Sequence, residues 1–278
     1  MSQEEANFVK LLRSPEQANV AIALEIAEGN TVFQPHLEPY TALCHWAFSN
    51  EPTVEYITTL NQPELSLEDH DLTYVPPEIS TLDHLVGLDL NINLLTSLPP
   101  EIGQLTHLKQ LILSNNQLQI LPPEIQGLTE LEELNLGANQ LKKLPKEIGS
   151  LKSLIWLNLF ANKLTALPVE IGGLESLEQL HFGGDNIRRL PKSIGKLSTL
   201  IQLSAEGNRL VKLPDEICQL QNLEVLQLFS SNGRLKKMPK YIANLQKLNT
   251  LVLGGQPIKK RERQRIETSL PNCTIEFE

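Results

Sequence analysis

The chain has 278 residues, of which 41% are hydrophobic and 21% charged, a balance typical of a folded protein. Aromatic residues make up only 5%, so the core must be built from aliphatic side chains. The formal net charge of −9 argues against a nucleic-acid-binding protein, because such proteins gain much of their affinity by neutralising phosphates.

The N-terminus, MSQEEANF, carries neither the basic nor the apolar segment of a signal peptide. No run reaches the roughly 18 apolar residues of a membrane span. Cys44, Cys218 and Cys273 lie far apart, with no metal-binding spacing and no disulfide framework. We therefore expect a cytoplasmic protein; a chain whose leader had been removed would show the same pattern.

Residues 1–62 do not repeat, are strongly acidic and are predicted to be helical. SPEQANVAIALEIAEGN predicts a helix with Ser14 as N-cap, Pro15 at the first position and Gly29 just past the end. Its apolar residues, Val20, Ile22, Leu24 and Ile26, suit packing against other helices. A second helix is expected within residues 38–49, where Trp46 is interpreted as a core residue.

A 23-residue repeat dominates the rest of the chain. Columns of proline and isoleucine recur at the same spacing as Leu-x-Leu pairs, and the unit reads LxxLxLxxNxLxxLPxxIxxLxx. A unit this short cannot bury its own leucines, so neighbouring units must stack and share one core. The pairs begin at Leu65, Leu88, Leu111, Leu134, Leu157, Leu180, Leu203, Leu226 and Leu251, the last step being 25 residues.

Within each unit the spacing changes. Leu-x-Leu has the period of two of a strand with both leucines inward, whereas LPxxIxxL has the three- and four-residue spacing of a short helical turn. We expect proline at the first helical position, where no N–H is needed. At the second leucine position of two neighbouring pairs, the repeat has a large Phe182 and a small Ala205. This predicts that the phenylalanine ring lies over the alanine methyl group.

An asparagine column follows the strands, and an amide can both donate and accept hydrogen bonds to a buried turn. Asp185 interrupts this column. We expect it to lie near solvent; the alternative is a buried turn in which a carbonyl loses its partner. The column contains Asn93, Asn116, Asn139, Asn162 and Asn208.

This repeat resembles that of leucine-rich repeat proteins, specifically the 23-residue class found in intracellular Ras-group and bacterial members. The resemblance implies an α/β solenoid, a curved horseshoe with a parallel β-sheet on its concave face. We expect a helical N-terminal cap over 1–62, about nine repeat strands over 63–257, and a cap helix with a final strand over 258–278.

Two groups of basic residues have alternative interpretations. The run 259–265 is expected on a solvated helix face with its charges favourably near the helix C-terminus, the alternative being a binding patch. A second group is predicted along one edge of the solenoid, either as solvated surface or as a contact for an acidic partner. It comprises Lys142, Lys143, Lys146, Arg188, Arg189, Lys192, Lys212, Lys236, Lys237 and Lys240.

No catalytic, metal-binding or cofactor motif stands in the sequence, so we expect neither an enzyme nor a cofactor. The residues left free by the fold are those between and beside the strand leucines, which must point out of the concave face. Because aromatics are scarce, their clustering there predicts a binding patch. It comprises Trp156, Asn158, Phe160, Gln179, His181, Gln202, Glu206, Gln227 and Phe229.

The leading hypothesis is a monomeric, non-enzymatic module that binds a protein partner through this patch, with no nucleic acid and no membrane span. The family resemblance implies a protein partner, for example a signalling GTPase or kinase. Two alternatives remain open at this point. The chain could be a recognition domain of, or an accessory to, a kinase, GTPase or ligase, or it could be a secreted host-interaction protein.

Overall fold

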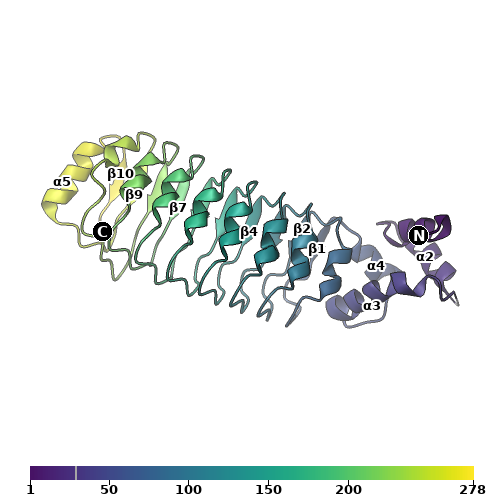
Figure 1. Cartoon of the computed structure of the whole chain (residues 1–278). Helices are drawn as coiled ribbons and strands as arrows, with labels where there is room; N and C mark the ends of the chain where they lie inside the picture. The colour runs from purple at the N-terminus through teal and green to yellow at the C-terminus, as the bar shows by residue number, and fades with distance from the viewer. Residues whose placement is uncertain (29) are drawn as a thin grey trace.

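The computed structural model describes residues 1–28 and 30–278. This part of the chain forms an elongated row of stacked units, with helices α1 to α4 at the N-terminal end and helix α5 at the other (Figure 1). The N-terminal helices are α1 (Gln3–Leu12), α2 (Gln17–Ala27), α3 (Gln34–Phe48) and α4 (Val54–Leu60).

Ten parallel strands of three residues form one open sheet in which each strand pairs with the next in sequence. Equivalent positions face one another, as Leu134 faces Leu157, so each repeat column forms a row across the sheet. The predicted Leu-x-Leu strands are confirmed. They are β1 (Glu64–Ser66), β2 (Gly87–Asp89), β3 (Gln110–Ile112), β4 (Glu133–Asn135), β5 (Trp156–Asn158), β6 (Gln179–His181), β7 (Gln202–Ser204), β8 (Val225–Gln227), β9 (Thr250–Val252) and β10 (Thr274–Glu276).

The opposite side of the solenoid consists of short 3-10 helices, which fits the predicted helical turns. In seven of the eight, however, the repeat proline is the residue before the helix, as at Pro145 with φ −67° and ψ 151°. The prediction of proline at the first position is therefore wrong by one residue. The helices are η1 (Pro77–Thr81), η2 (Pro100–Gln104), η3 (Pro123–Gly127), η4 (Lys146–Ser150), η5 (Val169–Gly173), η6 (Lys192–Lys196), η7 (Asp215–Gln219) and η8 (Ile242–Asn244).

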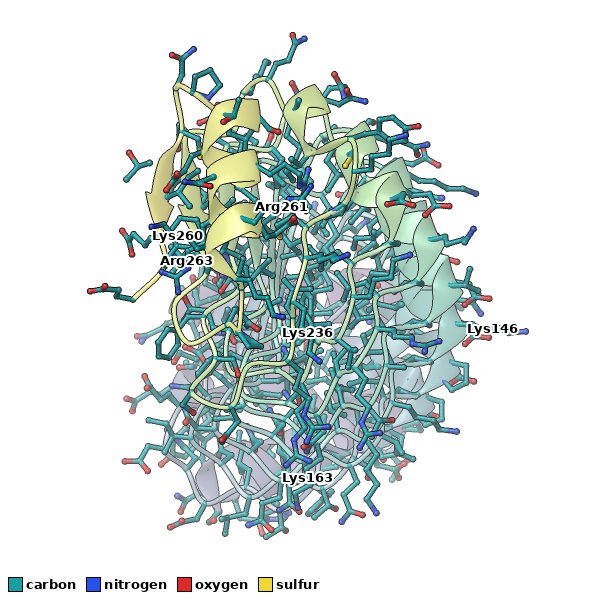
Figure 2. The ribbon with its side chains drawn as sticks, turned by 90° about the vertical axis from the view of Figure 1, so that its left-hand side faces the viewer. Lys146, Lys163, Lys236, Lys260, Arg261 and Arg263 are labelled. Carbon is teal, nitrogen blue, oxygen red and sulfur yellow. The ribbon has the colours of Figure 1, made fainter. Side chains whose placement is uncertain are left out.

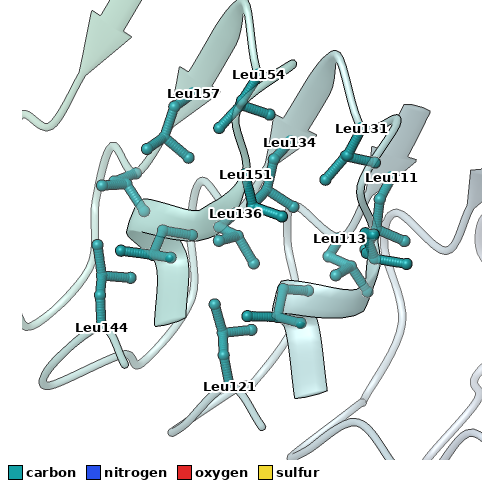
Figure 3. Packing of buried hydrophobic residues seen from close by; sticks show 14 of the residues in the cluster. Leu111, Leu113, Leu121, Leu131, Leu134, Leu136, Leu144, Leu151, Leu154 and Leu157 are labelled. Atoms are coloured by element: carbon teal, nitrogen blue, oxygen red, sulfur yellow. The ribbon is translucent and has the colours of Figure 1, made fainter. Parts of the chain in front are cut away.

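The leucines of successive repeats fill the space between the sheet and these helices (Figure 3). Leu111, Leu134 and Leu157 are fully buried, as are their neighbours in the same columns. The core continues without interruption into the N-terminal helices. Trp46 is confirmed as a core residue: it is 5% exposed and its Nε1 donates to the Tyr74 carbonyl at 2.7 Å.

The start of α2 differs from the prediction. The helix begins at Gln17 with Glu16 as its N-cap, and Ser14 Oγ instead accepts from the Glu16 N–H and from Asn19 Nδ2. The predicted stop at Gly29 lies outside the described residues. Helix α3 (Gln34–Phe48) confirms the second predicted helix, beginning before residue 38.

The apolar residues of α2 do not all pack inward. Val20 is fully buried, whereas Ile22 and Ile26 are 46% and 41% exposed. The expectation that all of them contact other helices is therefore wrong for these two isoleucines, because alternate residues of a helix cannot share one buried face.

The asparagine column forms a ladder of hydrogen bonds between repeats. Asn139 Nδ2 donates to the carbonyls of Leu113 at 2.8 Å and Leu136 at 3.2 Å, and its Oδ1 accepts from the Leu118 N–H at 2.9 Å. The same pattern recurs at the other columnar asparagines. Gln256 takes this role in the last repeat, bonding the Leu235 N–H and the Leu228 carbonyl.

Asp185 occupies the ladder position of its repeat and is only 4% exposed, so the expectation that it lies near solvent is wrong. Its Oδ1 accepts from the Leu164 N–H at 2.8 Å. Its Oδ2 is buried with no partner among the described residues. Burial raises the pKa of this carboxyl to about 6, because the charged form loses its hydration.

The register of β6 and β7 places Phe182 beside Ala205, and both are buried, at 0% and 2% exposure. We expect Ala205→Leu to lower the free energy of unfolding by about 1–3 kcal/mol, because the ring already fills the space that a leucine would need. Calorimetry should show a lower melting temperature, with Ala166→Leu, at an exposed alanine, as the control. An unchanged value for Ala205→Leu would contradict the assignment.

At the C-terminal end, α5 (Lys260–Ser269) precedes β10, which pairs in parallel with β9 so that Ile275 faces Leu251. The predicted final strand is confirmed. The prediction that the basic run 259–265 lies near the C-terminus of its helix is wrong. The run lies at the start of α5, and the last turn of that helix carries no basic residue. Among the described residues, no helix is long and apolar enough to cross a membrane.

Candidate functional site

The parallel register gathers the predicted patch residues on neighbouring strands of the concave face. Trp156 on β5 faces Gln179 on β6, and Gln179 in turn faces Gln202 on β7. In the next row Asn158 faces His181 and His181 faces Ser204. Ser204 in turn faces Gln227 on β8. The structure therefore brings these residues into two adjacent rows.

The two phenylalanines lie two residues beyond β5 and β8 and are among the most exposed aromatics of the described chain, at 50% for Phe160 and 43% for Phe229. Each ring lies across a glycine of the following repeat. A Cβ added at Gly183 would come within 2.7 Å of the Phe160 ring, and one added at Gly254 within 2.9 Å of the Phe229 ring. These two glycines therefore let the rings lie over the backbone.

Trp156 and His181 contact each other across the strands. Their ring centroids are 6.0 Å apart with an interplanar angle of 49°, which is within the range of favourable aromatic pairs. Burial lowers the pKa of His181 below its usual value, so the imidazole is neutral at pH 7. The pair presents an aromatic surface with a neutral hydrogen-bonding edge.

The polar residues of the patch differ in how many hydrogen bonds their side chains already make within the protein. Asn158 donates to Asn135 Oδ1 and accepts from the Phe160 N–H, both at 3.0 Å, so it also holds the strand end. Gln202 donates to Gln227 Oε1 at 3.4 Å. Within the described part of the chain, the side chains of Gln179 and Glu206 make no hydrogen bond, and they are half-buried.

Two features of the surface were missed by the sequence interpretation. Val225 faces Gln202 and adds an apolar residue beside the patch; the sequence places it in the same outward column, but the predicted patch did not include it. At the other end, Phe48 stacks on Tyr56 with centroids 4.5 Å apart, and both line a cleft of about 600 Å³ with Tyr74. No repeat column covers that segment, so sequence spacing could not place these aromatics together.

The basic edge is only partly one surface. Arg189, Lys192 and Lys212 line a common groove. Viewed from the C-terminal end, Lys146 projects on the side of the 3-10 helices, away from Lys236 (Figure 2). No group of three metal-ligating side chains is present among residues 1–28 and 30–278.

The stacked leucine columns, the parallel strands and the asparagine ladder recur in known proteins. A family model described as "Leucine-rich repeat region" matches residues 101–183 and 144–274. The chain belongs to the leucine-rich repeat proteins. No curated protein matches this leucine-rich repeat chain.

Solved structures give the same result. A leucine-rich repeat protein of Leptospira interrogans is 40% identical, with a TM-score of 0.62, over 77% of this chain and 59% of that one. The ectodomain of the receptor kinase GASSHO1/SCHENGEN3 from Arabidopsis thaliana is 30% identical, with a TM-score of 0.62, over 78% of this chain and 28% of that one. The chain thus spans less than two thirds of either relative.

Proposed function

We propose that this leucine-rich repeat protein is a non-enzymatic interaction module that binds a segment of a partner protein on its concave face. The observation that carries the proposal is the set of Trp156, Phe160 and Phe229, which a rigid sheet presents outward in a chain poor in aromatics. Aromatic side chains at the centre of an interface contribute most of the binding energy, because they bury a large area at little entropic cost.

The polar rows between the phenylalanines suit the same task. Gln179 and Glu206 offer unoccupied donors and acceptors, and the neutral His181 adds another beside Trp156. Such groups can pair with the backbone of a bound segment while the rings cover its side chains. The Arabidopsis relative supports this proposal, because that leucine-rich repeat ectodomain was solved in complex with Casparian Strip Integrity Factor 2.

A reducing compartment is part of the proposal. All three cysteines are free, and Cys44 and Cys218 are buried. Burial raises the pKa of each of these two thiols to about 11, so neither is reactive at neutral pH. Their role is therefore packing, as expected where thiols stay reduced.

Replacing Trp156, Phe160 and Phe229 together by alanine should weaken partner binding at least about a hundredfold, because each anchor contributes on the order of 1–2 kcal/mol. Partners captured by the wild type would be identified by mass spectrometry, and their dissociation constants would then be measured by titration calorimetry with purified proteins. Circular dichroism should be unchanged, since the three side chains lie outside the core.

The matched control replaces three exposed apolar residues away from the concave face, Ile120, Val169 and Tyr241, by alanine. This control variant should bind like the wild type. The proposal is wrong if the concave triple variant retains wild-type affinity, or if the control variant loses as much.

A further inference from the structure

A second surface lies at the C-terminal end, where the start of α5 and the loop after β8 line a cleft of about 870 Å³. Lys236 and Lys237 come from the loop of the eighth repeat, and Lys259 and Arg261 from the start of α5. Figure 2 shows this end of the molecule, with Arg261 on the helix and Lys236 on the loop below it. The fold thus joins two basic segments that are 23 residues apart in the sequence into one surface.

An ion pair holds two further lining residues, Glu262 and Arg265, in place. Glu262 Oε1 accepts from Arg265 Nη2 at 2.7 Å and from the Met238 N–H at 3.0 Å. Arg265 Nη2 also donates to the Met238 carbonyl at 3.0 Å. The hydrogen bond from Arg265 lowers the pKa of Glu262, so the carboxylate stays ionised and its charge is neutralised in place. These contacts join α5 to the loop and make the cleft a rigid feature.

The other four cations remain available. Lys236, Lys237, Lys259 and Arg261 are exposed and form no ion pair with any described residue. Lys259 and Arg261 also stand at the N-terminal end of α5, where positive charge is unfavourable because of the helix dipole. The helix dipole therefore does not explain the position of these two charges.

We propose that this cleft binds an acidic segment of a polypeptide, with the four free cations pairing with its carboxylates. The cleft volume of about 870 Å³ lies within the range of sites that hold a ligand of limited size, so a short segment suits it better than a large anionic body. Residues 1–75 carry twelve acidic and two basic residues, a net charge of −10, and residues 185–278 carry sixteen basic and nine acidic, a net charge of +7. A short acidic segment meets only the positive end, whereas a long polyanion would also meet the negative one.

The test uses the full chain and a fluorescein-labelled peptide with consecutive glutamates, compared with the same peptide carrying glutamines. Fluorescence anisotropy should show binding of the glutamate peptide alone. Raising NaCl from about 50 to about 300 mM should weaken this binding at least about tenfold, because exposed charges are screened. Lys236→Glu with Arg261→Glu should also weaken it at least about tenfold, and Lys236→Arg should preserve it.

The matched control is Lys142→Glu with Lys143→Glu, which changes the charge equally and occupies the repeat positions equivalent to Lys236 and Lys237 in an earlier repeat. This variant should keep peptide binding. Equal loss in the control, equal binding of the glutamine peptide, or tighter binding of single-stranded DNA or anionic vesicles at the same cleft would overturn the proposal. The concave triple variant should still bind the peptide, so this test is independent of the proposed function.

Discussion

Asp185→Asn should stabilise the protein at pH 7. An amide at this position can donate to the carbonyls of Leu159 and Phe182, as Asn139 does to the equivalent carbonyls of its own turn. Among the described residues, one asparagine side chain donates to each of these carbonyls, Asn162 to Leu159 and Asn208 to Phe182, and Asp185 Oδ2 has no partner there. We expect a gain of about 1–3 kcal/mol in the free energy of unfolding, measured by chemical denaturation.

The gain should depend on pH in a defined direction. Burial raises the pKa of Asp185 from 3.8 to about 6, so the folded state binds this proton more tightly than the unfolded state. The stabilisation from the protonated carboxyl is therefore complete below about pH 4 and is lost as the pH rises through 6. For a shift of about two units, the loss is on the order of 2–3 kcal/mol.

The difference in stability between Asp185→Asn and the wild type should therefore grow from pH 4 to pH 7. Subtracting the two curves removes the titration of all other groups. Asn139→Asp, the reverse change in a regular repeat, should lose stability at pH 7 and recover part of it at pH 5. A pH-independent difference for Asp185→Asn would contradict the assignment of a buried carboxyl.

Asn139→Leu should be among the most damaging single changes in the chain. The side chain is buried, and the Leu118 N–H would lose its acceptor within the core. Leaving such a group unpaired, together with the loss of two donors to carbonyls, should cost about 2–5 kcal/mol. Thermal unfolding followed by circular dichroism would measure the effect.

Asn186→Leu is the matched control for this change, because Asn186 is exposed in the corresponding loop. It should shift the melting temperature by little. If Asn139→Leu were equally mild, the ladder would have no large energetic role and the interpretation of the column would be wrong.

The sequence predicts most of this fold because the repeat itself encodes the register. Once the Leu-x-Leu columns are aligned, a fixed spacing determines which residue of one strand faces which residue of the next, as Trp156 faces Gln179. The outward rows of the concave face follow without any knowledge of long-range contacts. For the same reason the residues of the candidate patch could be named before the structure, although their role in binding remains a proposal.

The prediction failed where no neighbouring repeat constrains the chain. Ser14 and Pro15 look like a helix start, but the serine side chain bonds Asn19 and the helix begins at Gln17. The direction of the charges on α5 was also wrong, because the helix begins within the basic run. Asp185 was misplaced for another reason: the fold of its neighbours buries that position whatever residue occupies it.

The ladder also has a direction along the chain. Each columnar asparagine reaches back to backbone groups that precede it by 21 and 26 residues, as Asn139 does to Leu118 and Leu113. A turn is therefore completed only by the repeat that follows it. During synthesis on the ribosome, the newest repeat to emerge always lacks these bonds, and the nascent solenoid should become ordered one repeat behind the growing end.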